Sequence, residues 1–103
     1  MSSHDPQQTF MQEGAAQAAA LLRAVGNEHR LLVLCLLLAH GEMTVGALHA
    51  QVPLSQSALS QHLARMRDEG LVSFRREAQT LYYRIENPHV ARLIATLKDI
   101  FCP

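Results

Sequence analysis

The sequence lacks a long apolar run and any excess of charge of one sign. Its longest uninterrupted apolar stretch is Leu31–Ala39, nine residues, which is about half of what a membrane-spanning helix needs. The N-terminal segment MSSHDPQQTF contains no basic part followed by an apolar block, so we expect no secretory signal and a cytoplasmic protein. Nine basic and nine acidic residues cancel, so net charge by itself indicates neither a nucleic-acid nor a membrane partner.

Cysteine is scarce, and the motifs of common enzymes are missing. Only Cys35 and Cys102 are present, 67 positions apart. In the reducing cytosol such a pair is inert or redox-active and is rarely a permanent disulfide. The chain contains no CxxC, HExxH or GxSxG motif and no glycine-rich phosphate loop. We therefore expect no enzymatic activity and no bound cofactor.

Length and composition favour a single folded domain. The chain has 103 residues, of which 49% are hydrophobic and 17% charged, a mixture too apolar for a disordered protein. A chain this short buries only about 60–65% of its unfolded surface, so dimerisation would add stability. We predict a flexible N-terminal tail over 1–12, which is polar, contains Pro6 and shows no period, and one domain over 13–103.

The spacing of apolar residues predicts four helices in the first two thirds of the chain. The first is rich in alanine, and the second is apolar nearly all round, which is typical of a core helix. Three of them follow a residue whose side-chain oxygen can accept hydrogen bonds from the first backbone N–H groups. These caps are Asn27, Thr44 and Ser55, and the four predicted helices span 15–25, 28–40, 45–51 and 56–69.

The hydrophobic period changes after Gly70. Residues 71–76 and 80–85 alternate between apolar and polar side chains, which predicts two strands. Their buried faces are expected to hold Val72, Phe74, Leu81, Tyr83 and Ile85. The three residues between the strands have the length of a hairpin connection, although the absence of glycine leaves the turn type open. An Asn-Pro pair at 87–88 then begins a helix to the C-terminus, so the predicted fold is mainly α (α+β), in the order α-α-α-α-β-β-α.

The helices 45–51 and 56–69, separated by a VPLS break, form a helix-turn-helix pattern. In the second of them, Leu59, Leu63 and Met66 lie on one inward stripe, so the opposite face points outward. A face of short or amide side chains with one arginine fits a major groove about 12 Å wide, although an ordinary solvated face has a similar composition. The outward residues are Gln56, Ser57, Ser60, Gln61, Ala64 and Arg65.

Basic residues are concentrated near the predicted hairpin. Between His62 and Arg84 the sequence has five arginines against three acids. Arg75 and Arg76 end the first strand, close to Gln79, where a wing would meet a phosphate or the minor groove. We therefore predict salt-sensitive binding to double-stranded DNA with few phosphate contacts per subunit, His62 serving in packing or as one such contact. The predicted DNA-binding residues are Gln56, Ser57, Ser60, Gln61, His62, Arg65, Arg75, Arg76 and Gln79.

The stretch LSQSALSQHLARMRDEGLVSFRREAQTLYYRI resembles the recognition helix and wing of ArsR/SmtB-type winged-helix repressors, and the likeness extends over 15–103. The chain resembles more specifically the dithiol branch of BigR-, SqrR-, YgaV- and HlyU-like regulators. This likeness lies in the segments SQxxxSQHLxxMRDEGLV and RREAQTxYY, in Cys35 within an RLLxLC helix and in Cys102 within a terminal FCP. This resemblance implies a winged helix-turn-helix and a homodimer paired through its first and last helices. It also implies a near-palindromic operator with half-sites about 34–36 Å apart, and reactive sulfur species or oxidants as inducers.

Taken singly, each cysteine has a purely structural interpretation. Cys35 suits a small buried side chain among leucines, and Cys102 suits an incidental residue at a chain end. If the last helix packs beside helix 28–40, the two sulfurs could approach each other. A direct disulfide needs the two Cα atoms within about 7 Å, and a longer polysulfide bridge relaxes that limit. The resemblance implies such a bridge, which would shift the recognition helices. Burial is expected to raise the pKa of Cys35, and which thiol reacts first stays open.

Three other interpretations stay open at this point. The first is a metal-responsive repressor, with a third ligand beside Cys35 and Cys102, although the histidines are scattered and the last helix offers only His89 and Asp99. The second is a regulator that displaces another DNA-bound protein and senses no small molecule. The third is a winged-helix module that binds proteins and not DNA. The residues alone assign no metal site.

Overall fold

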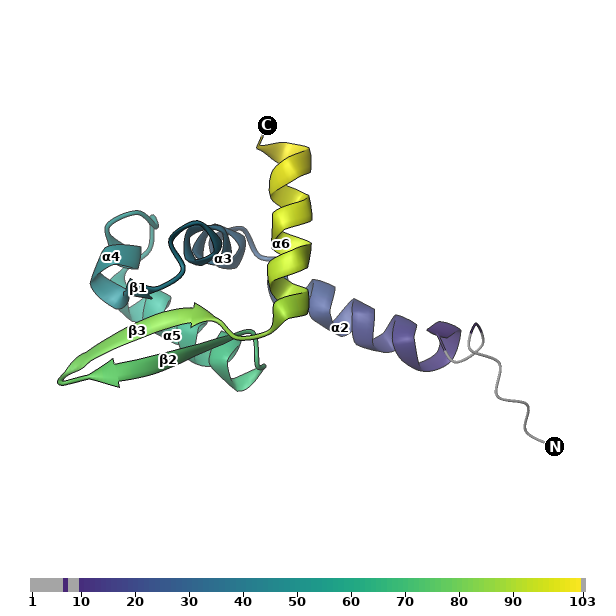
Figure 1. Cartoon of the computed structure of the whole chain (residues 1–103), viewed down its shortest axis with the longest axis horizontal. Coiled ribbons are helices and arrows are strands. Elements are labelled where there is room, and N and C mark those ends of the chain that lie inside the picture. The colour runs from purple at the N-terminus through teal and green to yellow at the C-terminus, as the bar shows by residue number, and fades with distance from the viewer. Residues whose placement is uncertain (1–6, 8–9, 103) are drawn as a thin grey trace.

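The computed structural model describes residues 7 and 10–102 of the chain. These residues form helices and a small antiparallel sheet, and the sheet hairpin precedes the last helix (Figure 1). In chain order the elements are η1 (Phe10–Gly14), α2 (Ala15–Val25), α3 (Glu28–His40), β1 (Met43–Thr44), α4 (Val45–His49), α5 (Gln56–Asp68), β2 (Val72–Glu77), β3 (Thr80–Ile85) and α6 (Pro88–Phe101). The predicted mainly α winged helix-turn-helix, with its helices and two long strands in that order, is confirmed.

Capping side chains explain where four of the helices begin. The side chain of Asn27 accepts hydrogen bonds from two backbone N–H groups in the first turn of α3, at 3.0 and 3.1 Å. Thr44 and Ser55 cap α4 and α5 through single bonds of 3.1 Å. Asn87 caps α6 at 2.8 Å, with Pro88 at the first helical position. The three predicted caps and the predicted start of the last helix are therefore confirmed.

Several elements differ from the prediction, among them α5, which ends at 68 and not 69, and β2, which spans 72–77 and not 71–76. The helix α4 ends at His49, two residues early, because residues 50–51 form a turn that leads into the proline break. The helix η1 begins at Phe10, so the predicted tail over 1–12 overlaps it, and residues 1–6, 8 and 9 of that tail lie outside the described part of the chain. The strand β1 was missed because two residues show no period; it forms by pairing with β3, Met43 opposite Tyr83.

The sheet has three antiparallel strands in the spatial order β1-β3-β2. The strands β2 and β3 pair along their full length, with Glu77 opposite Thr80, which leaves only Ala78 and Gln79 in the turn. The predicted three-residue connection is therefore wrong by one residue, because Glu77 joins the ladder. Ala78 has a φ of 56°, the left-handed conformation that two-residue hairpin turns require at their first central position.

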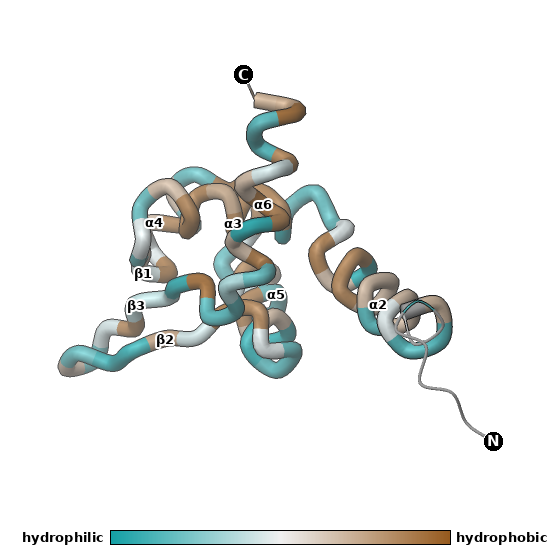
Figure 2. The backbone as a smooth tube through the Cα atoms, turned by 45° about the vertical axis from the view of Figure 1, so that its right-hand side comes forward, coloured by the Kyte–Doolittle hydropathy of each residue, from teal (hydrophilic) through white to brown (hydrophobic). Residues whose placement is uncertain are grey.

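The core lies between α3, α5, α6 and the sheet, and α3 contacts both α6 and β3. In Figure 2 hydrophobic residues are frequent along α3 and α6. Fully buried side chains are Val33, Leu34, Leu37, Leu48, Leu59, Leu63, Met66, Val72, Val90 and Ile94. Of the other residues predicted on the buried strand faces, Tyr83 is buried, whereas Phe74, Leu81 and Ile85 are half-buried. The core therefore fixes α5 and the sheet in one frame.

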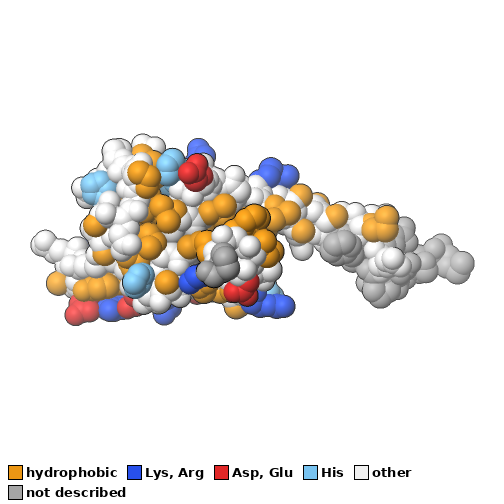
Figure 3. All heavy atoms as spheres, turned by 90° about the horizontal axis from the view of Figure 1, so that it is seen from above, with side chains coloured by type: hydrophobic (Ala, Val, Ile, Leu, Met, Phe, Trp, Pro, Cys, Tyr) orange, Lys and Arg blue, Asp and Glu red, His pale blue; other side chains and the backbone are white. Residues whose placement is uncertain are grey.

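The helix α2 and the far end of α6 extend beyond this core (Figure 1). Val25 is the one buried residue of α2, and Leu22 is 56% exposed. Ile100 and Phe101, at the end of α6, are 62% and 75% exposed, and Figure 3 shows apolar side chains around α6 that continue toward α2. The described part of the chain thus leaves apolar surface on both helices uncovered. None of its helices is both long and apolar enough to cross a bilayer.

Candidate nucleic-acid interface and cysteine pair

The helix α5 has one buried and one exposed face, as its sequence predicts. Leu59, Leu63 and Met66 are at most 1% exposed and lie in the core. The helix ends at the exposed acid Asp68. Over residues 56–65, the side opposite the core carries short polar and amide side chains that reach solvent without an acidic residue among them. These exposed residues are Gln56, Ser57, Ser60, Gln61, Ala64 and Arg65. Such a surface can enter a major groove and present hydrogen-bonding groups to base edges.

The connection between α4 and α5 holds the exposed face in a fixed frame. Leu48 of α4 is fully buried, and Val52 in the connection is 4% exposed. The backbone N–H of Val52 donates to the carbonyl of Leu48 at 3.0 Å, and the N–H of Leu54 donates to the carbonyl of Val52 at 2.8 Å. Because the turn is hydrogen-bonded and Leu48 and Val52 are buried, α5 is presented as part of a rigid helix-turn-helix.

Arg75, predicted to contact DNA from the wing, is already engaged within the protein. Its Nε–H donates to both carboxylate oxygens of Glu42, at 3.1 and 3.0 Å, and one Nη donates to Glu77 at 2.8 Å. The guanidinium also lies over the ring of Tyr82, 4.3 Å from its centroid. Hydrogen bonds from Arg75 to Glu42 and then to Glu77 raise the pKa of Arg75. Two carboxylates therefore balance the charge of this arginine.

The other residues of the wing are more open to a partner. Arg76 and Gln79 are exposed near the hairpin turn, and among residues 10–102 Arg76 has no carboxylate within ion-pair distance. Arg84 donates through Nε to the hydroxyl of Ser73 at 3.4 Å. The hairpin thus has one uncompensated arginine next to its turn, where a wing meets the DNA backbone.

Arg30 in α3 is a residue that the sequence analysis missed. It is 9% exposed and is the only buried charged residue of the described chain. Its Nε–H donates to Nδ1 of His62 at 3.2 Å, one Nη donates to the carbonyl of Ala24 at 3.0 Å, and that Nη lies 3.8 Å from a carboxylate oxygen of Glu69. These contacts connect the end of α2 and the start of α3 to α5. The signal available in the sequence was an arginine in the first turn of a helix whose next residues, 31–39, are all apolar.

His62, predicted in packing or as a phosphate contact, is half-buried beside Arg30. Burial lowers the pKa of His62, and the charges of Arg30, His29 and Arg65 lower it further, so the neutral imidazole is favoured. A cavity of about 470 Å³ opens between α3 and α5 at this point. It is lined by Arg30, Ala58, Gln61, His62, Ala64 and Arg65.

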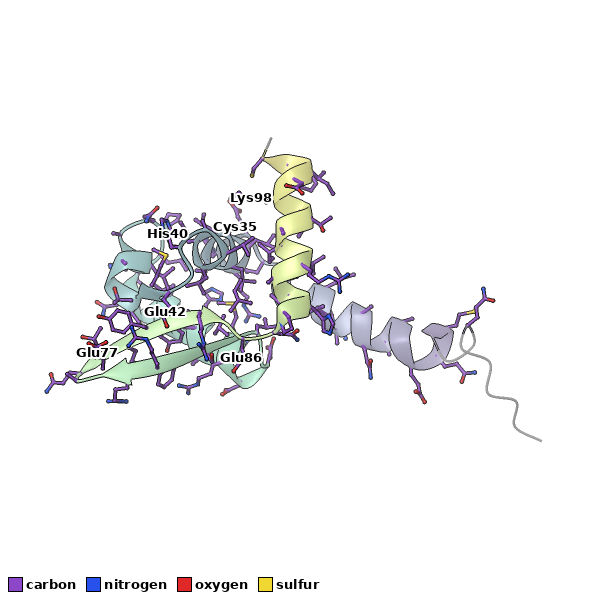
Figure 4. The ribbon with its side chains drawn as sticks, in the orientation of Figure 1. Cys35, His40, Glu42, Glu77, Glu86 and Lys98 are labelled. Atoms are coloured by element: carbon purple, nitrogen blue, oxygen red, sulfur yellow. The ribbon has the colours of Figure 1, made fainter. Side chains whose placement is uncertain are left out.

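Cys35 lies in α3, which packs against α6, and Cys102 directly follows the last residue of α6. Cys35 is half-buried, Cys102 follows α6 and is exposed, and both thiols are free. Burial raises the pKa of Cys35, as predicted, the charge of Cys102 raises it further, and Lys98 of α6 lowers it. Figure 4 shows Cys35 and Lys98 where the two helices come together. The two thiols are therefore within electrostatic reach of each other.

A metal site was the main alternative use of the two cysteines. Among the described residues, no group of three or more histidine, cysteine, aspartate or glutamate side chains lies close enough to hold a metal ion. His89 and Asp99, the two candidates on the last helix, lie in the first and last turns of α6. In the described part of the chain, the two cysteines therefore belong to no cluster of three or more possible ligands of these types.

Comparison with known proteins agrees with this architecture. Residues 27–73 match the model of the bacterial regulatory protein, arsR family. The HTH-type transcriptional regulator YgaV of Escherichia coli (strain K12) is 50% identical over 93 residues, which are 90% of this chain and 94% of YgaV. Reduced HlyU from Vibrio cholerae N16961 superposes with a TM-score of 0.86 at 45% identity, covering 92% of this chain and 99% of HlyU. The transcriptional repressor BigR from Xylella fastidiosa gives 0.82 at 34% identity, over 93% and 97%. The chain therefore belongs to the ArsR family of DNA-binding transcriptional regulators.

Proposed function

We propose that this regulator is a homodimeric repressor whose affinity for operator DNA falls when Cys35 and Cys102 react with a reactive sulfur species or an oxidant. The observation that carries the proposal is the pair of free thiols, one in α3 and one directly after α6, within electrostatic reach of each other. The helix α3 also contacts α5 through Arg30, so a change at the cysteines has a route to the DNA-binding helix. A bacterial regulator of operator DNA works in the cytoplasm, where the DNA lies.

In this proposal the exposed face of α5 reads bases in the major groove, and the wing contacts the backbone. Gln56 and Ser57, at the N-terminal end of α5, lie deepest in the groove. Arg65 and Arg76 supply the stronger phosphate contacts, because Arg75 is balanced by two carboxylates. The proposed DNA-binding residues are Gln56, Ser57, Ser60, Gln61, His62, Arg65, Arg75, Arg76 and Gln79.

The uncovered apolar surface of α2 and α6 supports pairing of two subunits through these helices. Leu22, Ile100 and Phe101 are each more than half exposed, and a second copy of the chain would bury them. A two-fold dimer presents two copies of α5, and these fit a near-palindromic operator whose half-sites are about 34–36 Å apart. Any rotation of one subunit against the other changes that spacing and lowers affinity for DNA.

The chemistry of the switch begins at the exposed thiol. The thiolate of Cys102 attacks the outer sulfur of a low-molecular-weight persulfide, RSSH, which forms a Cys102 persulfide and releases RSH after protonation. The thiolate of Cys35 then attacks the inner sulfur and forms the Cys35–Cys102 disulfide, with hydrosulfide as the leaving group. In sum, two protein thiols are oxidised, and RSSH is reduced to RSH and H₂S. Lys98 assists because its charge favours the Cys35 thiolate.

The experiment that tests the proposal combines mass spectrometry with operator titration, before and after treatment with a persulfide donor. We expect a Cys35–Cys102 link, directly or through additional sulfur, together with weaker DNA binding. Cys35→Ser and Cys102→Ser should bind the operator and keep it after treatment, and the double variant controls for effects unrelated to thiols. Single variants that release DNA as the wild type does would exclude the sensing role and leave a DNA-binding regulator without this trigger.

A further inference from the structure

The contact between Arg30 and His62 determines which ring nitrogen of His62 carries hydrogen. An arginine side chain has donors and no acceptor, so Nδ1 of His62 must accept the 3.2 Å bond from Nε–H of Arg30 with its lone pair. A neutral imidazole then carries its hydrogen on Nε2. The lowered pKa of His62 agrees with a neutral ring. The donor Nε2–H lies on the opposite side of the ring and points away from Arg30.

Arg30 is itself held firmly enough to impose this state. It is bonded to the carbonyl of Ala24, in the last turn of α2, and lies 3.8 Å from the carboxylate of Glu69. Two neighbouring elements therefore hold this α3 side chain in place, α2 through Ala24 and the C-terminal end of α5 through Glu69. A planar guanidinium that is already oriented loses little freedom when it bonds a further group.

The space beside His62 is suited to an anion. The cavity of about 470 Å³ is lined by two arginines, His62 and Gln61, with two alanines that leave it open and with no carboxylate in its lining. It lies along α5 between the exposed DNA-facing residues and α3. A duplex whose major groove receives α5 carries its phosphates past the flanks of that helix. The ligand chemistry that fits is a phosphate with an oxygen facing Arg65 and the imidazole N–H.

We propose that Arg30 is a positioning residue for operator binding, which holds His62 as the Nε2–H tautomer so that His62 and Arg65 donate to one backbone phosphate of the DNA. This inference rests on the proposed DNA binding and adds a residue that lies on α3, outside the helix-turn-helix. His62 is then a backbone contact, whereas Arg30 acts through His62 and touches no DNA. A neutral N–H donor and one guanidinium share the phosphate.

Operator titration of four variants beside the wild type, at fixed salt, tests the inference. Arg30→Met removes the hydrogen-bond donor and keeps a side chain of similar length, and His62→Ala removes the imidazole. The third variant combines these two changes. His29→Ala is the control, because the ring of His29 lies 6.4 Å from the ring of His62 but makes no hydrogen bond with Arg30. We expect each of the first two to weaken binding about tenfold, equally for specific and non-specific duplexes, as loss of a backbone contact does. The double variant should bind the operator no less tightly than the single variant with the lower affinity. The control should bind the operator as the wild type does.

The tautomer is measured directly by two-bond ¹H–¹⁵N spectra of the histidine rings. In the wild type we expect Nδ1 of His62 without hydrogen and Nε2 with hydrogen, and in Arg30→Met a mixture of tautomers. If Arg30→Met does not fold, Arg30→Lys keeps the buried charge but lacks the fork that reaches both partners, and the same loss is expected. Hydrogen on Nδ1 in the wild type, or additive losses in the double variant, would overturn the inference.

Two further outcomes separate this inference from the function on which it rests. Wild-type protein that does not bind the operator contradicts the proposed function, whereas normal wild-type binding with unchanged affinity in both single variants contradicts the role of Arg30 alone. Inorganic phosphate, titrated against chloride at equal ionic strength, distinguishes the source of the anion. We expect the His62 ring signals to shift on addition of duplex and not on addition of phosphate; a saturable shift with phosphate would overturn the assignment to the DNA backbone.

Discussion

The two parts of the candidate DNA surface, α5 and the wing, differ in how their charges are held. Over residues 56–65 the exposed face of α5 has no acidic residue among its polar side chains, and Arg65 is exposed there; the exposed acid Asp68 lies at the C-terminal end of the helix. In the wing, Arg75 is bonded to Glu42 and Glu77 and stacked over Tyr82. The number of arginines in a segment therefore gives its positive charge, but it does not tell how many of these arginines are free to contact DNA. We expect α5 to dominate both stability and readout, and the wing to contribute a smaller, adjustable electrostatic effect.

The largest expected effect concerns the buried face of α5. Leu63 is 1% exposed in the core, so Leu63→Ala should lower the free energy of unfolding by about 2–5 kcal/mol through lost burial and a cavity. Ser60→Ala, on the exposed face of the same helix, is the control and should change it by less than about 0.5 kcal/mol. Chemical denaturation measures both. Equal losses in the two variants would contradict the assignment of the faces.

The second prediction concerns base readout by the exposed face. Gln61→Ala should cost about 1–3 kcal/mol of binding free energy at one operator position, because one base edge loses its hydrogen-bonding partner. Titration against a set of operators, each changed at one base pair, measures the effect. A uniform loss over all sequences would show instead that Gln61 contacts the backbone.

The third prediction concerns the balanced arginine of the wing. Glu42→Gln and Glu77→Gln each remove one negative charge from Arg75, so operator binding at low salt should tighten several-fold, by about 1 kcal/mol. The dependence of binding on salt should become steeper, which titrations at three salt concentrations measure. Arg75→Ala in the wild-type background is the control and should weaken binding less than Arg76→Ala. Unchanged or weaker binding in both glutamine variants would refute the balanced-charge account.

The smallest expected effect concerns the hairpin turn. Ala78 has a φ of 56°, a conformation that costs a residue with a Cβ about 1 kcal/mol. Ala78→Gly should therefore raise the free energy of unfolding by about 0.5 kcal/mol, since glycine relieves the strain but loses more backbone entropy. Gln79→Gly is the matched control in the same turn and should give no gain. A lower stability of Ala78→Gly than of the wild type would contradict the strain.

Titration of His62 adds a pH dependence to the same comparison. Its pKa is lowered in the folded protein, mainly by burial and then by Arg30, His29 and Arg65. The unfolded chain then binds more protons, so stability should fall as pH drops below about 6.5 and level off below the folded pKa. Thermal unfolding between pH 8 and pH 5 measures this loss, which His62→Gln should reduce. An identical pH profile in His62→Gln would contradict the contribution of this histidine.

The sequence predicts those features that depend on neighbouring residues. The caps Asn27, Thr44 and Ser55 act within three positions of themselves, and the stripe on α5 is a helical period. Both can be recognised from the order of the amino acids alone. The strand β1 cannot, because two residues carry no pattern and are ordered only by pairing with β3. The turn was misjudged because Glu77 pairs across the hairpin, which its polar character does not indicate.

The features of the site that the sequence does not predict depend on tertiary packing. Arg30 bonds His62 across 32 positions, and Glu42 bonds Arg75 across 33. Neither pair follows a period, and each is set by how α3 and the sheet lie on the core. The same packing places α3, with Cys35, beside α6, which Cys102 follows, and there the resemblance to a known family carried the expectation.

The most direct test of the account is the affinity of the wild-type protein for its operator, measured at one salt concentration in the reduced and the persulfide-treated state. A coupling of about 1–3 kcal/mol between cysteine modification and DNA binding corresponds to a loss of about 5- to 150-fold. We expect a loss in that range, absent in Cys102→Ser. Equal affinity in both states, with the link between Cys35 and Cys102 verified by mass spectrometry, would contradict the account.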